Sequence, residues 1–201
     1  MNVNVLHDSR ICEIRWHGRG GQGAITSAQL LADTAYNESF LGVTASPTFG
    51  AERRGAPITA STRLSLKPVR IFSQIEVPDI VIVLDSTLLA TANATQGLKP
   101  GGWLIVNTSE NPDQLGISGD FSIATADATF AAQKVGLVVS GFAMVNTAML
   151  GAFARTTEMI SLESIKNTFM RKFSAQAAQK NYEAASLTFE LTHLLRRGNG
   201  N

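Results

Sequence analysis

The sequence predicts a single α/β domain built on a doubly wound, mainly parallel sheet, with helices on both faces of the sheet and further helices at the C-terminus. Three observations lead to this Rossmann-like fold class. A glycine-rich turn at 18–23 follows a strand pattern and precedes a helix pattern. Two apolar runs, 79–85 and 102–107, are typical of strands buried on both faces of a parallel sheet. Helical periodicity dominates the last third of the chain.

The first half of the chain begins with a strand–helix–strand unit. Residues 12–17 alternate weakly between apolar and polar side chains and form the first strand. Alanine and leucine residues from Ala24 to Ala35 recur at helical spacing, which indicates a helix that ends near Glu38. A second strand at 41–45 completes the unit.

The next segment is expected to be a loop followed by a hairpin. Residues 46–57 hold two prolines, two glycines and a charged run, so they form a long irregular loop. Alternating β-branched residues predict a strand at 58–66, and 69–72 is expected to pair with it across the Lys67-Pro68 turn. A short helix at 87–96 separates the two buried strands.

Three helices are expected near the C-terminus. Asn146 or Thr147 caps the first, which runs to about Arg155, and Ser161 caps the second. The third runs from 175 to 196, with two arginines complementing its C-terminal dipole.

Length and composition exclude several classes of protein. We expect the 201 residues to form one domain, 1–201, with flexible tails at 1–10 and 198–201. The net charge of +1 gives no reason to expect nucleic acid or an anionic membrane as a partner. The single cysteine, Cys12, excludes a disulfide framework and an iron–sulfur cluster held by this chain alone. The three histidines are not spaced as a metal site, so none is expected.

The location expected for the chain is the cytoplasm. Residues 1–10 carry no targeting pattern. Residues 135–154 lack a formal charge and are long enough to span a bilayer, but glycines and polar residues interrupt them and no aromatic belt flanks them. A membrane span is therefore not favoured.

The glycine turn is the first candidate site. Gly18, Gly20 and Gly23 have the spacing G-x-G-x-x-G, which permits close backbone approach and leaves N–H groups at the helix start to attract an anion. Arg19 could add a contact to phosphate or carboxylate. Together with Gly21 and Gln22 these residues form a candidate cofactor-binding turn, although such turns also serve only to pack a helix on a sheet.

The alternative function, from a different class of protein, is a freestanding nucleotide- or dinucleotide-binding module. It requires an acid at the end of the second strand to hold the ribose hydroxyl groups. That strand ends at Ala45-Ser46, and the nearest acid, Glu38, lies on the helix side of it. The dinucleotide interpretation is therefore not favoured.

The loop with Phe49, Glu52, Arg53 and Arg54 is the second candidate site. It is either a solvated charged loop or an interface that accepts a partner or an anionic ligand. Both loops are expected at the C-terminal edge of the sheet, where ligands bind in this fold, and this favours the functional interpretation.

No catalytic residue is expected in this chain. His17, beside the glycine turn, is more often a hydrogen-bonded structural histidine than a proton carrier. Cys12 alternates within a strand next to no activating group, so it is interpreted as a buried structural thiol.

Four segments, in this order, carry a family resemblance. They are 17–23 (HGRGGQG), 47–57 (PTFGAERRGAP), 78–85 (PDIVIVLD) and 146–152 (NTAMLGA). Together they resemble the gamma subunit of pyruvate and 2-ketoisovalerate ferredoxin oxidoreductases, and the likeness covers roughly residues 13–151. The form of 52–57 is more similar to this branch than to 2-oxoglutarate or indolepyruvate oxidoreductases, which are the alternative.

The resemblance implies a subunit of an enzyme that decarboxylates a 2-oxoacid and transfers the acyl group to coenzyme A. Thiamine diphosphate, Mg²⁺ and [4Fe-4S] clusters would be held in the complex by alpha, beta and delta subunits or fused equivalents, with ferredoxin as electron acceptor. In this chain the resemblance points to the glycine turn, Gly18 to Gly23, as a candidate ligand site. It points to Phe49, Glu52, Arg53, Arg54, Asn146 and Thr147 as residues that face the partner subunits and coenzyme A.

Overall fold

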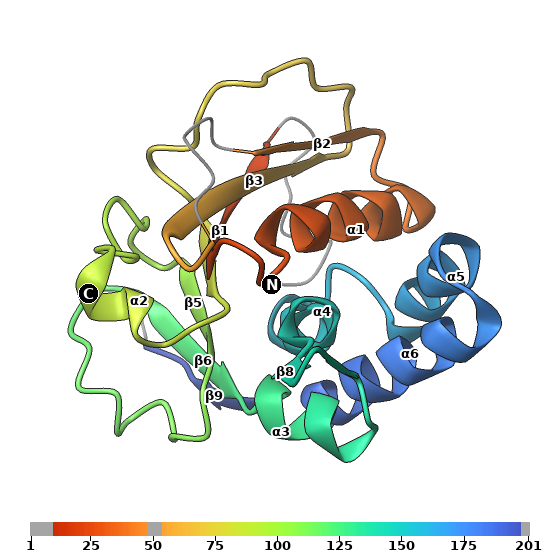
Figure 1. Ribbon diagram of the computed structural model, residues 1–201. Coiled ribbons are helices and arrows are strands. Elements are labelled where there is room, and N and C mark those ends of the chain that lie inside the picture. Colours follow the sequence, from red (N-terminus) through yellow and green to blue (C-terminus); the bar gives the residue numbers. More distant parts are fainter. Residues whose placement is uncertain (1–9, 48–53, 198–201) are drawn as a thin grey trace.

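The computed structural model describes residues 10–47 and 54–197, and the fold below refers to these residues. Its centre is a seven-stranded sheet with the order β2-β3-β1-β4-β5-β6-β9 (Figure 1). The strands are β1 (Cys12–Arg19), β2 (Gly42–Pro47), β3 (Pro57–Ser65), β4 (Ile80–Val83), β5 (Trp103–Asn107), β6 (Ser122–Ala126) and β9 (His193–Leu195), and β7 (Val138–Val139) and β8 (Phe142–Ala143) form a separate hairpin. The helices are α1 (Ala24–Asn37), α2 (Leu88–Thr91), α3 (Ala128–Lys134), α4 (Val145–Thr157), α5 (Leu162–Lys172) and α6 (Ala175–Glu190).

The sheet is parallel through its centre and antiparallel toward both edges. Strands β1, β4, β5 and β6 pair in parallel. Strand β3 lies between β1 and β2 and is antiparallel to both, and β9 is an antiparallel edge strand beside β6. The α/β class, the buried parallel strands and the C-terminal helices are confirmed. The carboxyl ends of β1, β4, β5 and β6 therefore meet at one edge, which is where the glycine turn begins.

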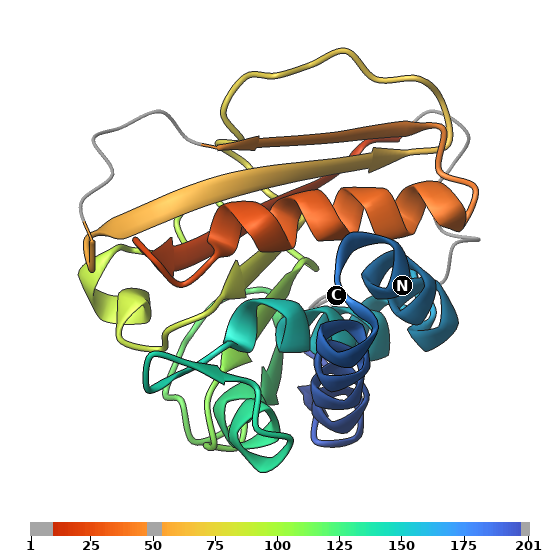
Figure 2. The ribbon, with the colours of Figure 1, turned by 45° about the vertical axis from the view of Figure 1, so that its right-hand side comes forward.

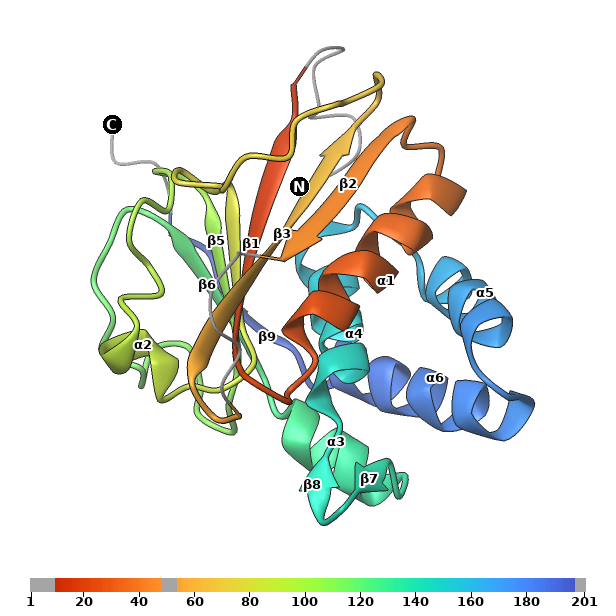
Figure 3. The ribbon, with the colours of Figure 1, turned by 45° about the horizontal axis from the view of Figure 1, so that its top comes forward.

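The two faces of the sheet are covered unequally. Figures 2 and 3 show α1 lying along the β2–β3–β1 half of the sheet, with α3, α4, α5 and α6 gathered below it on the same side. Alternate strand residues such as Ile80 and Ile82 point into this helical layer, whereas Val81 and Val83 pack with Leu88 of α2 on the other face. Helices occur on both faces as expected, but α2 is a single turn.

A buried hydroxyl group fixes α1 against the sheet. Trp16 Nε1 of β1 donates to Thr62 Oγ1 of β3 at 3.1 Å, and the same Oγ1 donates to the carbonyl oxygen of Ala28 in α1 at 3.0 Å. Thr62 thus satisfies the indole and joins three elements without leaving a polar group unpaired. The two hydrogen bonds of Thr62, together with the apolar packing around them, set the position of α1, whose first turn follows the glycine turn.

Helices α4 and α6 pack in backbone contact. A Cβ atom built on Gly151 would lie 1.8 Å from the carbonyl oxygen of Ala185, which is far inside van der Waals contact. Glycine is therefore required at this crossing, because the neighbour that a side chain would meet is backbone and cannot rotate away. The crossing holds α4 against α6, and the start of α4 reaches the glycine turn.

The expected pairing of 69–72 with the third strand is wrong. These residues form no strand, because β3 is already paired with β2 on one side and β1 on the other. The chain instead passes close over Gly42, where a Cβ atom would meet the carbonyl oxygen of Lys67, and the carbonyl oxygen of Ile71 accepts from Arg63.

The C-terminal expectations need two corrections. The final helix ends at Glu190, not at 196, and residues 193–195 form β9. Arg197 donates to the carbonyl oxygens of Gly119 and Ile117 and does not cap the helix.

The helix starts differ in part from the expectation. Ser161 caps α5 as expected. Helix α4 starts after Met144, so Asn146 and Thr147 lie inside its first turn and do not cap it. The helix expected at 87–96 shortens to α2, and β6, α3 and the β7–β8 hairpin were not expected from the sequence.

Candidate functional site

The glycine turn lies at the C-terminal edge of the parallel strands. Strand β1 continues as far as Arg19, so the turn is tighter than the sequence suggests. Gly21 and Gly23 have φ values of 94° and 79°, which side chains other than glycine rarely adopt. Gly23 is the N-terminal cap of α1 and offers no side chain to its first turn.

The end of the second candidate loop is bound to this turn. Gly20 N donates to the carbonyl oxygen of Ala56 at 2.8 Å, and Gly55 N donates to the carbonyl oxygen of Gly20 at 3.0 Å. Gly20 and Arg54 form an isolated parallel bridge. The structure therefore brings together two segments that are more than thirty positions apart. Phe49, Glu52 and Arg53 lie outside the described residues.

The Arg19 guanidinium is committed to partners within the chain. Its Nε donates to Asp85 Oδ2 at 2.9 Å, one terminal nitrogen donates to Thr87 Oγ1 at 2.7 Å, and the other donates to the carbonyl oxygen of Gly55 at 3.1 Å. Arg19 therefore joins the ends of β1 and β4 to the loop at 54–57. A ligand would have to displace these bonds to use this guanidinium.

Asp85 is the acceptor on which this arrangement converges. Gln22 Nε2 donates to its Oδ2 at 3.2 Å, and Thr87 donates to its Oδ1 from both the backbone and the hydroxyl. Burial alone would raise the pKa of this carboxyl, but the hydrogen bonds from Thr87, Arg19 and Gln22 lower it below its usual value. At neutral pH the Asp85 carboxylate is therefore ionised, and both of its oxygen atoms already accept hydrogen bonds from this chain.

Asn146 and Thr147 are buried in the first turn of α4. Their exposed fractions are 4% and 2%. The carboxamide of Asn146 lies against Gly23, since a Cβ atom built there would be 2.6 Å from Asn146 Nδ2. The carbonyl oxygen of Asn146 also accepts from Ser27 Oγ at 3.0 Å, which ties α4 to α1. Asn146 Oδ1 and Thr147 Oγ1 have no hydrogen-bond partner among residues 10–47 and 54–197.

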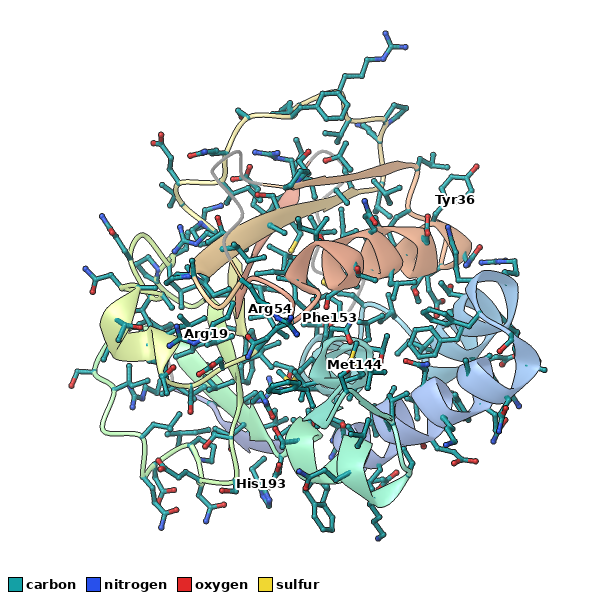
Figure 4. The ribbon with its side chains drawn as sticks, in the orientation of Figure 1. Arg19, Tyr36, Arg54, Met144, Phe153 and His193 are labelled. Atoms are coloured by element: carbon teal, nitrogen blue, oxygen red, sulfur yellow. The ribbon has the colours of Figure 1, made fainter. Side chains whose placement is uncertain are left out.

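Arg54 differs from Arg19 because its side chain is exposed and uncommitted. Within the part of the chain that the structure describes, its guanidinium makes no ion pair or hydrogen bond. Figure 4 labels Arg54 close to the first turn of α1, with Arg19 on one side and Met144, at the start of α4, on the other. Among the residues that the structure describes, Arg54 is thus a charged side chain of this edge that remains available to a ligand or partner.

His17 and Cys12 have structural environments. His17 accepts a hydrogen bond from Arg15 Nε at 3.0 Å, as expected of a structural histidine. Burial, and then the charge of Arg15, lower its pKa to about 4, so the imidazole is neutral at pH 7. Cys12 is buried as expected, and burial raises the pKa of its thiol to about 12.

The acid that a bound dinucleotide would need is used elsewhere. Glu38 ends α1 and accepts a hydrogen bond from Ser161 N at 2.7 Å, which joins α1 to the start of α5. Strand β2 ends at Pro47 without a carboxylate. Among residues 10–47 and 54–197, the end of β2 therefore offers no carboxylate to the ribose of a dinucleotide.

The described residues offer neither a group of metal ligands nor a helix suited to a membrane. No three His, Cys, Asp or Glu side chains within residues 10–47 and 54–197 are grouped so as to hold a metal ion. No helix among the same residues combines the length and the apolar character needed to cross a bilayer. The uncharged stretch at 135–154 begins just after α3 and is divided between the β7–β8 hairpin and most of α4.

Sequence reasoning did not identify Asp85 and Thr87 as part of this edge. In the sequence, Asp85 is only the acid that follows a buried strand. That position could have indicated its role, because the end of β4 lies beside the end of β1 in the parallel sheet. Thr87 carries no signal in the sequence. Its contact with Arg19 depends on the packing of β4 beside β1.

Comparison with known proteins is consistent with this geometry. The family model described as pyruvate ferredoxin/flavodoxin oxidoreductase matches residues 13–191. The common subunit gamma of the pyruvate/ketoisovalerate oxidoreductases of Thermococcus litoralis is 44% identical over 183 residues, which cover 90% of this chain and 96% of that one. Pyruvate synthase subunit PorC of Methanosarcina barkeri is 46% identical over 155 residues, covering 77% and 82%.

Among solved structures, the pyruvate oxidoreductase subunit PORC of Thermotoga maritima has a TM-score of 0.79 and 34% identity, and the match covers 92% of this chain and 98% of that one. A 2-oxoglutarate:ferredoxin oxidoreductase from Magnetococcus marinus has the same fold, with a TM-score of 0.69 at 20% identity. In that case the match covers 90% of this chain but only 31% of the other.

The contact between Gly23 and Asn146 can be measured as a coupling energy. We expect Gly23→Ala to lower the free energy of unfolding by about 2 kcal/mol or more, because it combines a positive φ with a steric overlap. In the double variant Gly23→Ala/Asn146→Ala the overlap with the carboxamide is removed and only the contact with Cβ at 3.2 Å remains, so its loss should be smaller than the sum of the two single losses. Urea unfolding of the four proteins gives these values, and additive losses would mean that the two residues do not interact.

His17 makes stability depend on pH. Its folded pKa of about 4 lies below the ordinary histidine pKa of 6.5, so the unfolded chain binds more protons between these two pH values. Stability from this group is complete above pH 6.5 and falls by roughly 3 kcal/mol at most as the pH drops through 4.

The variant His17→Gln should flatten the dependence of unfolding free energy on pH between 6.5 and 4.5, as measured by urea titrations at several pH values. The exposed His193 (labelled in Figure 4) provides the control, His193→Gln, which should keep the wild-type slope. Equal slopes in wild type and His17→Gln would contradict the assignment.

Proposed function

The chain belongs to the pyruvate ferredoxin/flavodoxin oxidoreductase family as a subunit of the gamma type, and we propose that it assembles with alpha, beta and delta subunits, or fused equivalents, in the cytoplasm. The complex oxidatively decarboxylates pyruvate, or a branched-chain 2-oxoacid, with coenzyme A as acyl acceptor and ferredoxin as electron acceptor. The observation that carries this proposal is the likeness to proteins named as gamma or PorC subunits over about nine tenths of the chain. The lower identity to the 2-oxoglutarate enzyme supports the pyruvate and ketoisovalerate branch.

The residues of this chain do not fit the cofactors of such an enzyme. An iron–sulfur cluster needs several thiolates, and Cys12 is a single, buried thiol whose pKa is raised to about 12 by burial. The described residues also offer no cluster of carboxylates for Mg²⁺ and the diphosphate that it would bind. We therefore assign thiamine diphosphate, Mg²⁺ and the [4Fe-4S] clusters to the partner subunits.

The glycine-turn edge is the surface that we assign to the partners and to coenzyme A. Arg54 supports this assignment because it is exposed and has no side-chain partner among residues 10–47 and 54–197. Asn146 and Thr147 are buried, so they contribute from beneath this surface by holding the start of α4 against α1. Phe49, Glu52 and Arg53 complete the proposed surface on the sequence pattern alone.

An anaerobic pull-down from source cells tests the proposal. The tagged chain should recover a thiamine-binding protein and a cysteine-rich iron–sulfur protein, and the recovered complex should reduce ferredoxin with pyruvate and coenzyme A. Arg53→Ala and Arg54→Ala should each lower recovery or coenzyme A-dependent turnover, whereas Arg70→Ala, an exposed arginine elsewhere, should not. Recovery of no such partner by the wild-type chain would remove the proposal.

A further inference from the structure

The β7–β8 hairpin carries apolar side chains on an exposed tip, residues 138–142. Val138, Val139 and Phe142 have exposed fractions of 43%, 57% and 69%. Val139 pairs directly with Phe142 across the hairpin, so these two side chains lie on the same face of it. Neighbouring apolar side chains that stay exposed on a folded protein indicate a binding surface, whereas single ones need no explanation. The hairpin tip is therefore a candidate interaction surface.

The base of the hairpin is anchored to the body of the domain. Leu137, just before the first strand, packs against the main hydrophobic core, and its N–H donates to the carbonyl oxygen of Ala132 in α3 at 2.8 Å. Met144 N donates to the carbonyl oxygen of Leu137 at 3.0 Å. The turn residues Ser140 and Gly141 both have positive φ values, 50° and 83°, as the common two-residue hairpin turn requires. The chain thus presents the tip in a fixed conformation, which lowers the entropy cost of binding.

The hairpin tip adjoins the edge that we assign to the partners. Figure 3 shows the hairpin beside α3, at the end of the molecule where the turn between β1 and α1 lies. Its second strand leads directly into α4, and Asn146, in the first turn of that helix, lies against Gly23 of the glycine turn. An interface formed at the glycine-turn edge would therefore extend onto the hairpin.

Two lysines border the hairpin without acidic partners. Lys180 Nζ, from α6, donates to the carbonyl oxygen of Gly136 at the hairpin base at 3.2 Å. Lys134 ends α3, and its Nζ lies 5.7 Å from the centre of the exposed Phe130 ring. Neither lysine forms an ion pair among residues 10–47 and 54–197. A complementary surface is therefore apolar at its centre, with carboxylates beside it.

We propose that the hairpin tip docks into an apolar depression bordered by carboxylates on a partner subunit of the complex. The inference rests on the proposed function, which supplies the partner. Phe142 is the expected anchor, because buried aromatic side chains dominate the energy of interfaces. A second copy of this chain fits less well, since a symmetric contact would bring the same lysines together. An anionic lipid surface also fits less well, because two lysines on a chain of net charge +1 attract it weakly.

Photochemical cross-linking in the assembled complex identifies what covers the tip. The photoreactive amino acid p-benzoylphenylalanine replaces Phe142 and, in the control, replaces Phe72, which is similarly exposed (67%) in the loop between β3 and β4. Position 142 should cross-link to a partner subunit about tenfold more efficiently than position 72, because the anchor is buried in the interface. A cross-link from position 142 only to a second copy of the chain, or none to a partner subunit, would overturn the proposal.

Matched substitutions measure how much the tip contributes to assembly, with the dissociation constant obtained by dilution of the purified complex. Phe142→Ser should raise this constant about tenfold, whereas Phe72→Ser should leave it unchanged. Lys134→Glu should raise it about threefold by repelling the carboxylates of the partner. The control is Lys166→Glu, which changes a lysine that also lies over a ring, that of Tyr182. Equal constants for Phe142→Ser and Phe72→Ser would contradict the docking.

Two further results distinguish the possible failures. Binding of the isolated chain to phosphatidylserine vesicles that Phe142→Ser abolishes would overturn the proposal in favour of a lipid surface. If the wild-type chain recovers no partner at all, the proposed function and this inference fail together. If the complex assembles equally well with Phe142→Ser and position 142 forms no cross-link, only this inference fails.

Discussion

The ion pair between Arg19 and Asp85 is the interaction on which the candidate site depends. It joins the last residue of β1 to the residue that follows β4 by two positions, at the edge where the parallel strands end. The same guanidinium holds the carbonyl oxygen of Gly55, so the loop at 54–57 is fixed to the glycine turn. Without this pair, three segments that are distant in sequence would lose their common anchor.

This constraint separates two arginines that look equivalent in the sequence. Arg19 pairs with Asp85 and holds the ends of the strands together, whereas Arg54, whose backbone lies beside Gly20, is exposed and has no side-chain partner among the described residues. Asn146 completes the arrangement from below, because its carboxamide packs against Gly23. The chain thus contributes a positively charged edge, while the chemistry of clusters and thiamine belongs to other subunits in the proposed complex.

Local patterns made much of the fold predictable, and long-range packing limited the rest. The glycine turn, α1 and the buried strand β4 follow from nearby residues, so the sequence predicted them well. The segment after Glu190 carries a helical stripe, but it pairs with β6, which no local pattern reveals. In the site, the turn was predictable, whereas the commitment of Arg19 depends on Asp85, a residue 66 positions away.

Amide hydrogen exchange at Gly55 tests the role of this ion pair most directly, because Gly55 N is bonded to the carbonyl oxygen of Gly20. In Arg19→Gln, exchange at Gly55 should accelerate about tenfold or more, since the loop loses its anchor and opens locally. The matched control is Arg10→Gln, which breaks an Arg–Asp pair of 2.7 Å with Asp79 at the opposite end of β4 and should leave Gly55 unchanged. Equal exchange at Gly55 in Arg19→Gln and the wild type would contradict the account.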